Sequence, residues 1–291
     1  MTLRSHSIIL AVLLAGVACE KDSKKTLDPS EYPKNVGDPA IVEMAEAGRT
    51  PHQPLRLKPA VDTEQKVQMN LEMDMKGPMA AAAPNMNMSM NMAAKVTKVE
   101  ANGNFHTEMG FEGIKFADPQ LESMGMGDML NGMKMTQITS ERGVMEGGGV
   151  QLPPDLAMLK PMFDDSMKQL AFALPKESVG IGASWTTKET LEKNNVRVYQ
   201  EITFTVAELA KNQAKLKMKL MQQAPSQTID MMGQKVKVEK LESKGTGSAT
   251  LAFDKPLPTA MNLTMDMTTK MSVNGQSVAM DMGLKVDMTS K

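Results

Sequence analysis

Long stretches of this chain alternate apolar and polar residues, and most of the apolar positions are methionine. Almost every second residue is apolar in 67–75, 261–273 and 278–288. Because successive side chains of a β-strand point to opposite faces, this pattern predicts strands with one half-buried face. Asn274-Gly275 separates the last two stretches and suits the tight turn of a hairpin. Strands of this length predict a broad, strongly curved antiparallel sheet rather than a compact sandwich.

Further alternating stretches predict strands before and after a middle region, residues 118–173, in which the alternation is replaced by helix-like or loop-like patterns. They cover 86–92, 94–100, 105–111, 183–191, 196–206, 214–220, 229–232, 236–241 and 248–253. The glycines in 118–134 weaken a helix, so a short helix or an ordered loop is expected there. In 155–172 apolar residues follow three-and-four spacing, which predicts an amphipathic helix that kinks or restarts at Pro161. The predicted fold class is mainly β (α+β): a long, curved, half-barrel-like antiparallel sheet packed on one or two central helices.

The first residues carry the pattern of an export signal. Arg4 precedes an apolar run over residues 8–18, which ends in small residues before Cys19. The run is too short to span a bilayer comfortably, so residues 1–18 are predicted to be a secretory signal peptide. This segment resembles the lipobox of bacterial lipoproteins, in which the cysteine is lipidated. The resemblance implies that the chain is held on a membrane of the bacterial cell envelope through Cys19, on the periplasmic or the cell-surface side.

Two points about this anchor stay open in the sequence. Gly16 stands where lipoproteins usually have leucine, so cleavage after Ala18 without lipidation is the alternative. Glu20, the residue after the cysteine, does not decide between the inner and the outer membrane.

Residues 19–56 are predicted to be a disordered tether. They hold a charge cluster directly after Cys19, prolines at 29, 33, 39, 51 and 54, and few apolar residues. Such a segment buries too little apolar surface to offset the entropy of ordering it. A short helical piece is expected at 40–47. The tether would leave residues 57–291 as one β-rich domain.

Composition narrows the functional classes. The 33 Lys and Arg residues nearly balance the 34 Asp and Glu residues, which argues against nucleic-acid binding. Cys19 is the sole cysteine, so the domain has no disulfide. The chain has 31 Met against 7 Phe, 2 Tyr and 1 Trp. Methionine is flexible and polarisable, which suits either a soft core or an adaptable binding surface.

One methionine tract has a pattern that is typical of a metal-binding site. Met86, Met88, Met90 and Met92 resemble the MxM tracts of periplasmic copper-handling proteins. Thioether sulfur is a soft ligand that selects Cu(I) or Ag(I), and residues two apart on a strand share one face. Core packing is the competing interpretation, because methionine occupies alternate positions all along the chain and no His or Trp stands next to this tract.

Two resemblances concern the whole domain. Long antiparallel strands interrupted by a helical middle, behind a lipobox, look like the half-barrel carriers of the lipoprotein-localisation system, which implies an apolar cavity for acyl chains. Leu174-Pro175 followed by Gly180-Ile181-Gly182-Ala183-Ser184-Trp185 resembles the "LP…VG..W" signature of uncharacterised secreted bacterial lipoproteins, which implies no activity. Trp185 is expected to anchor the core where a strand begins.

The expected function is a non-catalytic binding or structural role for a lipid-anchored envelope lipoprotein. An apolar or lipid ligand would lie between sheet and helix in a cavity lined by Met265, Met267, Met280 and Met282. Binding of Cu(I) or Ag(I) is the alternative. An enzyme is least favoured: nucleophile, phosphate-binding and HExxH motifs are missing, no catalytic residue is assigned, and only His106 stands on a predicted strand. No cofactor is expected, and the sequence does not identify a protein partner.

Overall fold

The computed structural model describes residues 26–77, 87–123, 125–151, 172–193, 195–231, 234–273 and 275–291. The predicted signal peptide, Cys19, Met86 and all but the last residue of the predicted helix at 155–172 lie outside these ranges.

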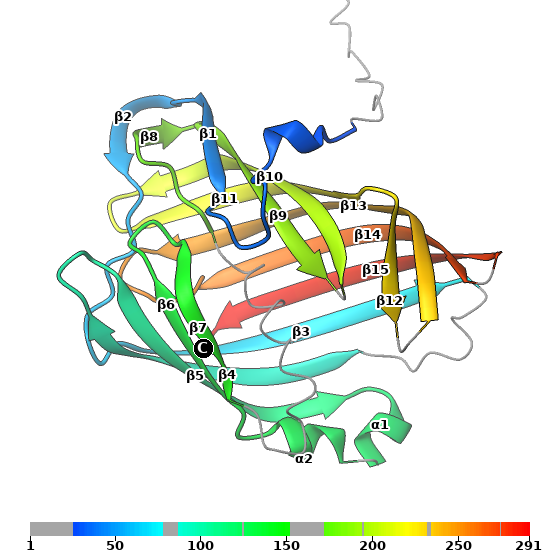
Figure 1. Ribbon diagram of the computed structural model, residues 1–291. Coiled ribbons are helices and arrows are strands. Elements are labelled where there is room, and N and C mark those ends of the chain that lie inside the picture. The colour runs from blue at the N-terminus through cyan, green and yellow to red at the C-terminus, as the bar shows by residue number, and fades with distance from the viewer. Residues whose placement is uncertain are drawn as a thin grey trace, which may run out of the picture.

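Most of the described chain forms one antiparallel sheet of 13 strands, as the alternation predicts (Figure 1). Its order is β1-β9-β10-β11-β13-β14-β15-β3-β4-β5-β6-β7, with β12 paired to β13, and β2 and β8 form a separate two-stranded sheet. The sheet is open, with β1 and β7 at its edges. The strands are β1 (Ile41–Glu46), β2 (Arg49–Pro54), β3 (Glu64–Lys76), β4 (Met88–Val99), β5 (Phe105–Phe116), β6 (Lys134–Thr139), β7 (Met145–Gln151), β8 (Ser178–Ile181), β9 (Ser184–Lys193), β10 (Val196–Ala210), β11 (Gln213–Ala224), β12 (Gln227–Met231), β13 (Gln234–Ala252), β14 (Ala260–Val273) and β15 (Gln276–Ser290).

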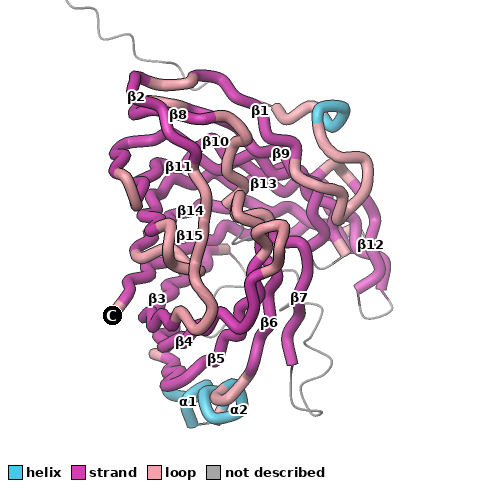
Figure 2. Tube along the Cα trace, turned by 90° about the vertical axis from the view of Figure 1, so that its left-hand side faces the viewer, coloured by secondary structure: helices cyan, strands magenta, loops and turns pink. Residues whose placement is uncertain are grey.

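The sheet curves so that its two ends share one core. Trp185 on β9 and Phe204 on β10 belong to the same buried cluster as Phe105 on β5 and Val150 on β7. These strands lie near opposite ends of the strand order, so the sheet must bend to bring them together. Figure 2 shows loop segments crossing one end of the bent sheet, between β2 and β8 above and β3 to β5 below. The face that carries the shared core is called the inner face below.

Methionine side chains align in rows across the inner face. Met261 on β14 lies opposite Met288 on β15, Met288 lies opposite Met69 on β3, and Met69 lies opposite Met90 on β4. A second row joins Met267 to Met282 and Met282 to Met75. Cross-strand neighbours pack directly on one another, so these rows are a structural unit of the sheet.

The structure contradicts the disordered tether over the described part of 19–56. Residues 41–46, where a helical piece was expected, form strand β1 at one edge of the large sheet, and β2 pairs with β8. Three side chains of this segment are deeply buried: Leu27 is 5%, Tyr32 4% and Leu55 0% exposed, whereas Val36 and Ile41 are exposed. Composition predicted disorder wrongly, because backbone pairing at a sheet edge and three deeply buried side chains are enough to order the segment.

Ion pairs and hydrogen bonds hold the same segment on the outer face of β9 and β10. The ammonium of Lys188 lies 2.9 Å from carboxylate oxygens of both Glu31 and Glu43. The Tyr32 ring packs against Tyr199, with 5.2 Å between centroids. A 3-10 turn, η1 (Pro29–Glu31), is capped by Asp28, whose side chain accepts a hydrogen bond from the Ser30 amide.

The helical middle also differs from its prediction. The described helices are the short α1 (Pro119–Ser123) and α2 (Met126–Leu130), which pack beside β5 rather than centrally under the sheet. Residues 134–139 and 145–151, inside the predicted helical region 118–173, form β6 and β7. The described chain is therefore mainly β, without the central helices of an α+β fold. None of its described helices is long and apolar enough to cross a membrane.

Candidate apolar cavity

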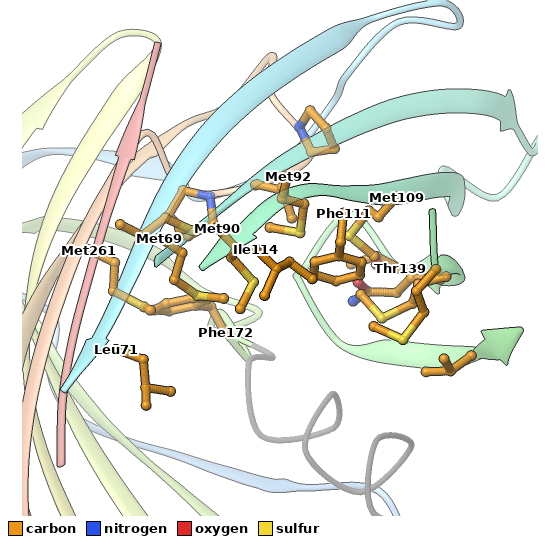
Figure 3. A pocket seen from close by; sticks show the side chains of 18 of the residues that line it. Met69, Leu71, Met90, Met92, Met109, Phe111, Ile114, Thr139, Phe172 and Met261 are labelled. Carbon is orange, nitrogen blue, oxygen red and sulfur yellow. The ribbon is translucent and has the colours of Figure 1, made fainter. Parts of the chain in front are cut away.

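A cavity of about 320 Å³ opens between the inner face of β3–β7 and the loops that cross this end of the sheet. Its volume lies within the range of small-molecule pockets. Figure 3 shows methionine sulfurs and aromatic rings from several strands around the cavity. The lining residues are Leu57, Met69, Leu71, Met88, Met90, Met92, Met109, Phe111, Ile114, Leu130, Met133, Met135, Gln137, Thr139, Gly143, Val150, Phe172, Leu251, Pro256, Leu257, Pro258, Met261 and Met288.

Strand register brings these side chains together. The row Met261–Met288–Met69–Met90 forms one wall. Met92 lies opposite Phe111, and Met109 on the same face of β5 lies opposite Met135, which extends the wall to β6. The period of two keeps each strand's contributions on one face, so the alternation seen in the sequence is what makes the wall continuous.

Three chain segments complete the cavity at the end of the sheet. Leu57 and Phe172 line it from the connections that follow β2 and precede β8, and Gly143 lines it from the β6–β7 turn. The Leu57 amide donates to the Glu141 carbonyl oxygen at 2.7 Å, and the Leu174 amide donates to the Arg142 carbonyl oxygen at 2.8 Å. These segments are called the strap below.

Arg56 fastens the strap. Its Nε lies 3.1 Å from the Glu141 carboxylate, and its terminal nitrogens donate to the carbonyl oxygens of Leu55, Pro175 and Lys176 at 2.8–2.9 Å. Gly143 is needed for close approach, because it has φ +74° and a Cβ there would collide with the Phe172 carbonyl oxygen. Specific hydrogen bonds, an ion pair and close backbone packing therefore fix the position of the strap.

The sequence-predicted metal tract is only partly described. Met88, Met90 and Met92 line the cavity together, while Met86 lies outside the described residues. Met90 and Met92 are 8% and 5% exposed and belong to the main core cluster. The three described methionines therefore pack as core residues and also present their side chains to the cavity.

The four methionines predicted to line a ligand cavity do not line this one. Met265, Met267, Met280 and Met282 share the inner face, but they lie nearer the opposite end of the β14–β15 hairpin from Met261 and Met288. Met265 is buried in the main core and the other three are half-buried. From Met261 to Met267 the strand advances by about 20 Å, at about 3.4 Å a residue. The prediction placed the ligand cavity on β14 and β15, whereas most residues that line the observed cavity belong to β3–β6.

Several lining residues were missed by sequence reasoning. Met69 and Met109 were recognised as strand residues on an apolar face, without being assigned to a cavity. Phe172, Leu57 and Leu257 come from segments expected to be helix, domain boundary or loop. The alternation of apolar residues could have placed Met69 and Met109 on the inner face. No sequence signal shows which strands are neighbours.

A polar row crosses the inner face near the second methionine row. Gln200 lies opposite both Glu189 and Gln222, and Gln222 lies opposite Ser243. The Lys193 ammonium donates to Gln222 at 3.1 Å, Gln222 donates to Gln200 at 2.6 Å, and Gln200 donates to Glu189 at 3.1 Å. Burial lowers the pKa of Lys193 to about 8 and raises the pKa of Glu189. The row separates the main core from a second cluster that contains Val198 and Val238.

The remaining singled-out residues lie away from the cavity lining. His106 is half-buried, with Nε2 at 2.8 Å from a Glu100 carboxylate oxygen. Hydrogen bonds from His106 and Lys98 lower the pKa of Glu100. Trp185 is fully buried and stacks on Phe204, which confirms its expected role as a core anchor. No group of three or more His, Cys, Asp or Glu side chains among the described residues is placed to hold a metal ion.

Residues 157–257 match a family of unknown function, DUF6263. The matched region includes the Leu174–Trp185 signature and strands β8–β13. No curated protein matches the chain.

The structure explains the signature residues through packing. Val179 and Leu174 are fully buried. Gly180 allows β8 to approach β2, because a Cβ at this position would overlap the Arg49 carbonyl oxygen. The signature therefore describes the junction between the strap, β8 and β9.

Proposed function

We propose that this protein is a lipid-anchored protein of the bacterial cell envelope that binds an apolar ligand in the cavity beneath the strap. The observation that carries the proposal is the cavity itself: about 320 Å³, with walls built from methionine, leucine and phenylalanine side chains. Methionine side chains adapt to ligands of irregular or flexible shape. The role is non-catalytic, and the curved open sheet with a cavity on its inner face supports kinship with half-barrel carriers of acyl chains.

Binding is tested with N-phenyl-1-naphthylamine, an uncharged apolar fluorophore. The protein is the exported chain with Cys19→Ser, which prevents lipid attachment and allows purification without detergent. Met88→Trp should fill the cavity and weaken fluorophore binding at least tenfold. Met282→Trp is the matched control, because Met282 is also half-buried on the inner face but is not part of the cavity lining. Equal binding by both variants would overturn the proposal.

Membrane attachment through Cys19 is tested separately. The wild-type chain, expressed in bacteria, should fractionate with membranes and carry the mass of a diacylated amino-terminal cysteine. Cys19→Ser should release it into the soluble fraction. An unlipidated mature chain that begins at Cys19 would instead support ordinary cleavage after Ala18.

Binding of Cu(I) or Ag(I) is a second candidate, favoured by the convergence of Met88, Met90 and Met92 with Met69 and Met109 on one cavity. Exchange of Met86, Met88, Met90 and Met92 for leucine should abolish Ag(I) binding in a titration and leave the circular dichroism spectrum unchanged. Unchanged Ag(I) affinity would end this candidate.

A further inference from the structure

Polar side chains gather at one place in the cavity wall. Gln137 and Thr139 on β6 line the cavity, on the same face as Met135. Thr107 lies on the same face of β5 as Met109 and directly opposite Gln137. Gln137 and Thr139 stand in a wall that is otherwise mainly apolar, and Thr107 lies beside Gln137 on the adjacent strand, behind the lining residues. These three residues are called the polar cluster here.

The hydrogen-bonding capacity of Thr107 is unused. Thr107 is 3% exposed, and its Oγ1 is buried without a hydrogen-bond partner. A buried hydroxyl in this state has lost its water without gaining a replacement. Residues directly opposite in an antiparallel pair have Cβ atoms about 4.5–5.5 Å apart, so Thr107 is the immediate neighbour of Gln137, which lines the cavity.

The charge of the lining limits which polar group fits. The cavity-lining residues within the described ranges include no Asp, Glu, Lys, Arg or His. A carboxylate or an ammonium group would lose its hydration there without gaining an ion-pair partner. A hydroxyl, ester or amide would exchange hydrogen bonds with threonine hydroxyls and the glutamine amide, which can both donate and accept.

We infer that the cavity selects neutral amphiphiles, with the hydrocarbon chain on the methionine wall and a hydroxyl, ester or amide group at the polar cluster. This inference rests on the proposed function, because it requires the cavity to admit a ligand. It adds the chemical class of that ligand and the residues that distinguish it from charged lipids of the same chain length.

The test uses three twelve-carbon probes that differ in their head group: dodecanol, dodecanoate and dodecyltrimethylammonium. Each displaces N-phenyl-1-naphthylamine from the Cys19→Ser chain at pH 8. Dodecanol should compete at least tenfold more tightly than either charged probe. Equal competition by all three would overturn the inference and leave the apolar cavity standing, whereas failure of the fluorophore to bind would overturn the proposed function itself.

A substitution of the same shape tests the polar cluster directly. Thr107→Val should weaken dodecanol binding about fivefold, as loss of one hydrogen bond implies, and leave fluorophore affinity unchanged. The ligand-free melting temperature should stay level or rise, because the unpaired hydroxyl is gone. Thr264→Val makes the same change at an exposed position on the outer face of β14 and should alter neither affinity.

Gln137→Leu tests the half-buried member of the cluster independently of Thr107. It should lower the preference for dodecanol over dodecanoate, while fluorophore binding reports that the cavity persists. Dodecanol affinity that is unchanged in both variants, or that falls in step with fluorophore affinity, would overturn the inference.

Discussion

The indole N–H of Trp185 donates a hydrogen bond to the carbonyl oxygen of Ala173 at 3.0 Å. The Trp185 ring also stacks on Phe204, with 5.3 Å between centroids, and Phe204 lies 6.1 Å from Phe172 in the cavity wall. One chain of contacts thus connects the β9–β10 hairpin to the strap and to the cavity.

Trp185→Phe should destabilise the protein by about 2 kcal/mol, because the buried carbonyl of Ala173 loses its donor and the smaller ring leaves unfilled volume. Urea denaturation followed by circular dichroism measures the change. Thr264→Val on the exposed outer face should alter stability by less than about 0.5 kcal/mol. A Trp185→Phe protein as stable as wild type would show that this contact does not hold the strap.

Gly180→Ala should destabilise by more than about 2 kcal/mol, since a Cβ would overlap the Arg49 backbone and separate β8 from β2. Gly110→Ala is the matched control: Gly110 is also a strand glycine, and a Cβ there meets nothing within 4 Å. Similar melting temperatures for the two variants would contradict the packing explanation of the signature.

Arg56→Met should lower stability by about 2–3 kcal/mol, because several carbonyl oxygens and the Glu141 carboxylate lose a donor that is only partly exposed. Arg56→Lys should rescue little, because an ammonium cannot reproduce the planar fork of donors. Hydrogen exchange should quicken at the amides of Leu57 and Leu174. Full protection of these amides in Arg56→Met would show that the strap is held by other contacts.

Lys193 gives the fold a dependence on alkaline pH. Its folded-state pKa, about 8, lies below the ordinary value of 10.5, so between these two pH values the unfolded chain binds more protons. Stability should therefore rise with pH through this window, by on the order of 1–3 kcal/mol, and the contribution of Lys193 should be constant below it.

The measurement is the difference in unfolding free energy between wild type and Lys193→Gln from pH 7 to pH 10.5. The difference should move in favour of wild type above about pH 8. Lys217→Gln, at an exposed lysine of β11, should show a flat difference. A flat difference for Lys193→Gln as well would mean that its ammonium is hydrated in the folded protein.

The strands were largely predictable, because alternation of the two faces is a local property. Residues 67–75 lie within β3, and the last two alternating stretches form β14 and β15 in the expected hairpin. Asn102-Gly103 separates β4 from β5, as expected for a tight turn. Prediction split β13 into two strands because Gly245 and Gly247 interrupt its apolar pattern. These glycines lie against the β14 backbone, an approach that only the folded pairing shows.

The cavity was not predictable, because it depends on pairings between distant parts of the chain. β15 lies beside β3, so that Met288 meets Met69 across more than two hundred residues of sequence. The strap depends likewise on Arg56 reaching Glu141 and Pro175. Met265 and Met267 are indistinguishable from Met261 in sequence pattern, and only the closing loops decide which methionines border open space.

The most direct measurement is a nuclear magnetic resonance spectrum of the Cys19→Ser chain with carbon-13-labelled methionine methyl groups, recorded before and after adding dodecanol. Resonances of Met69, Met88, Met90 and Met261 in the cavity wall should shift, while those of Met267, Met280 and Met282 should stay in place. Shifts confined to the second group, or no shift at saturating dodecanol, would contradict a ligand site beneath the strap.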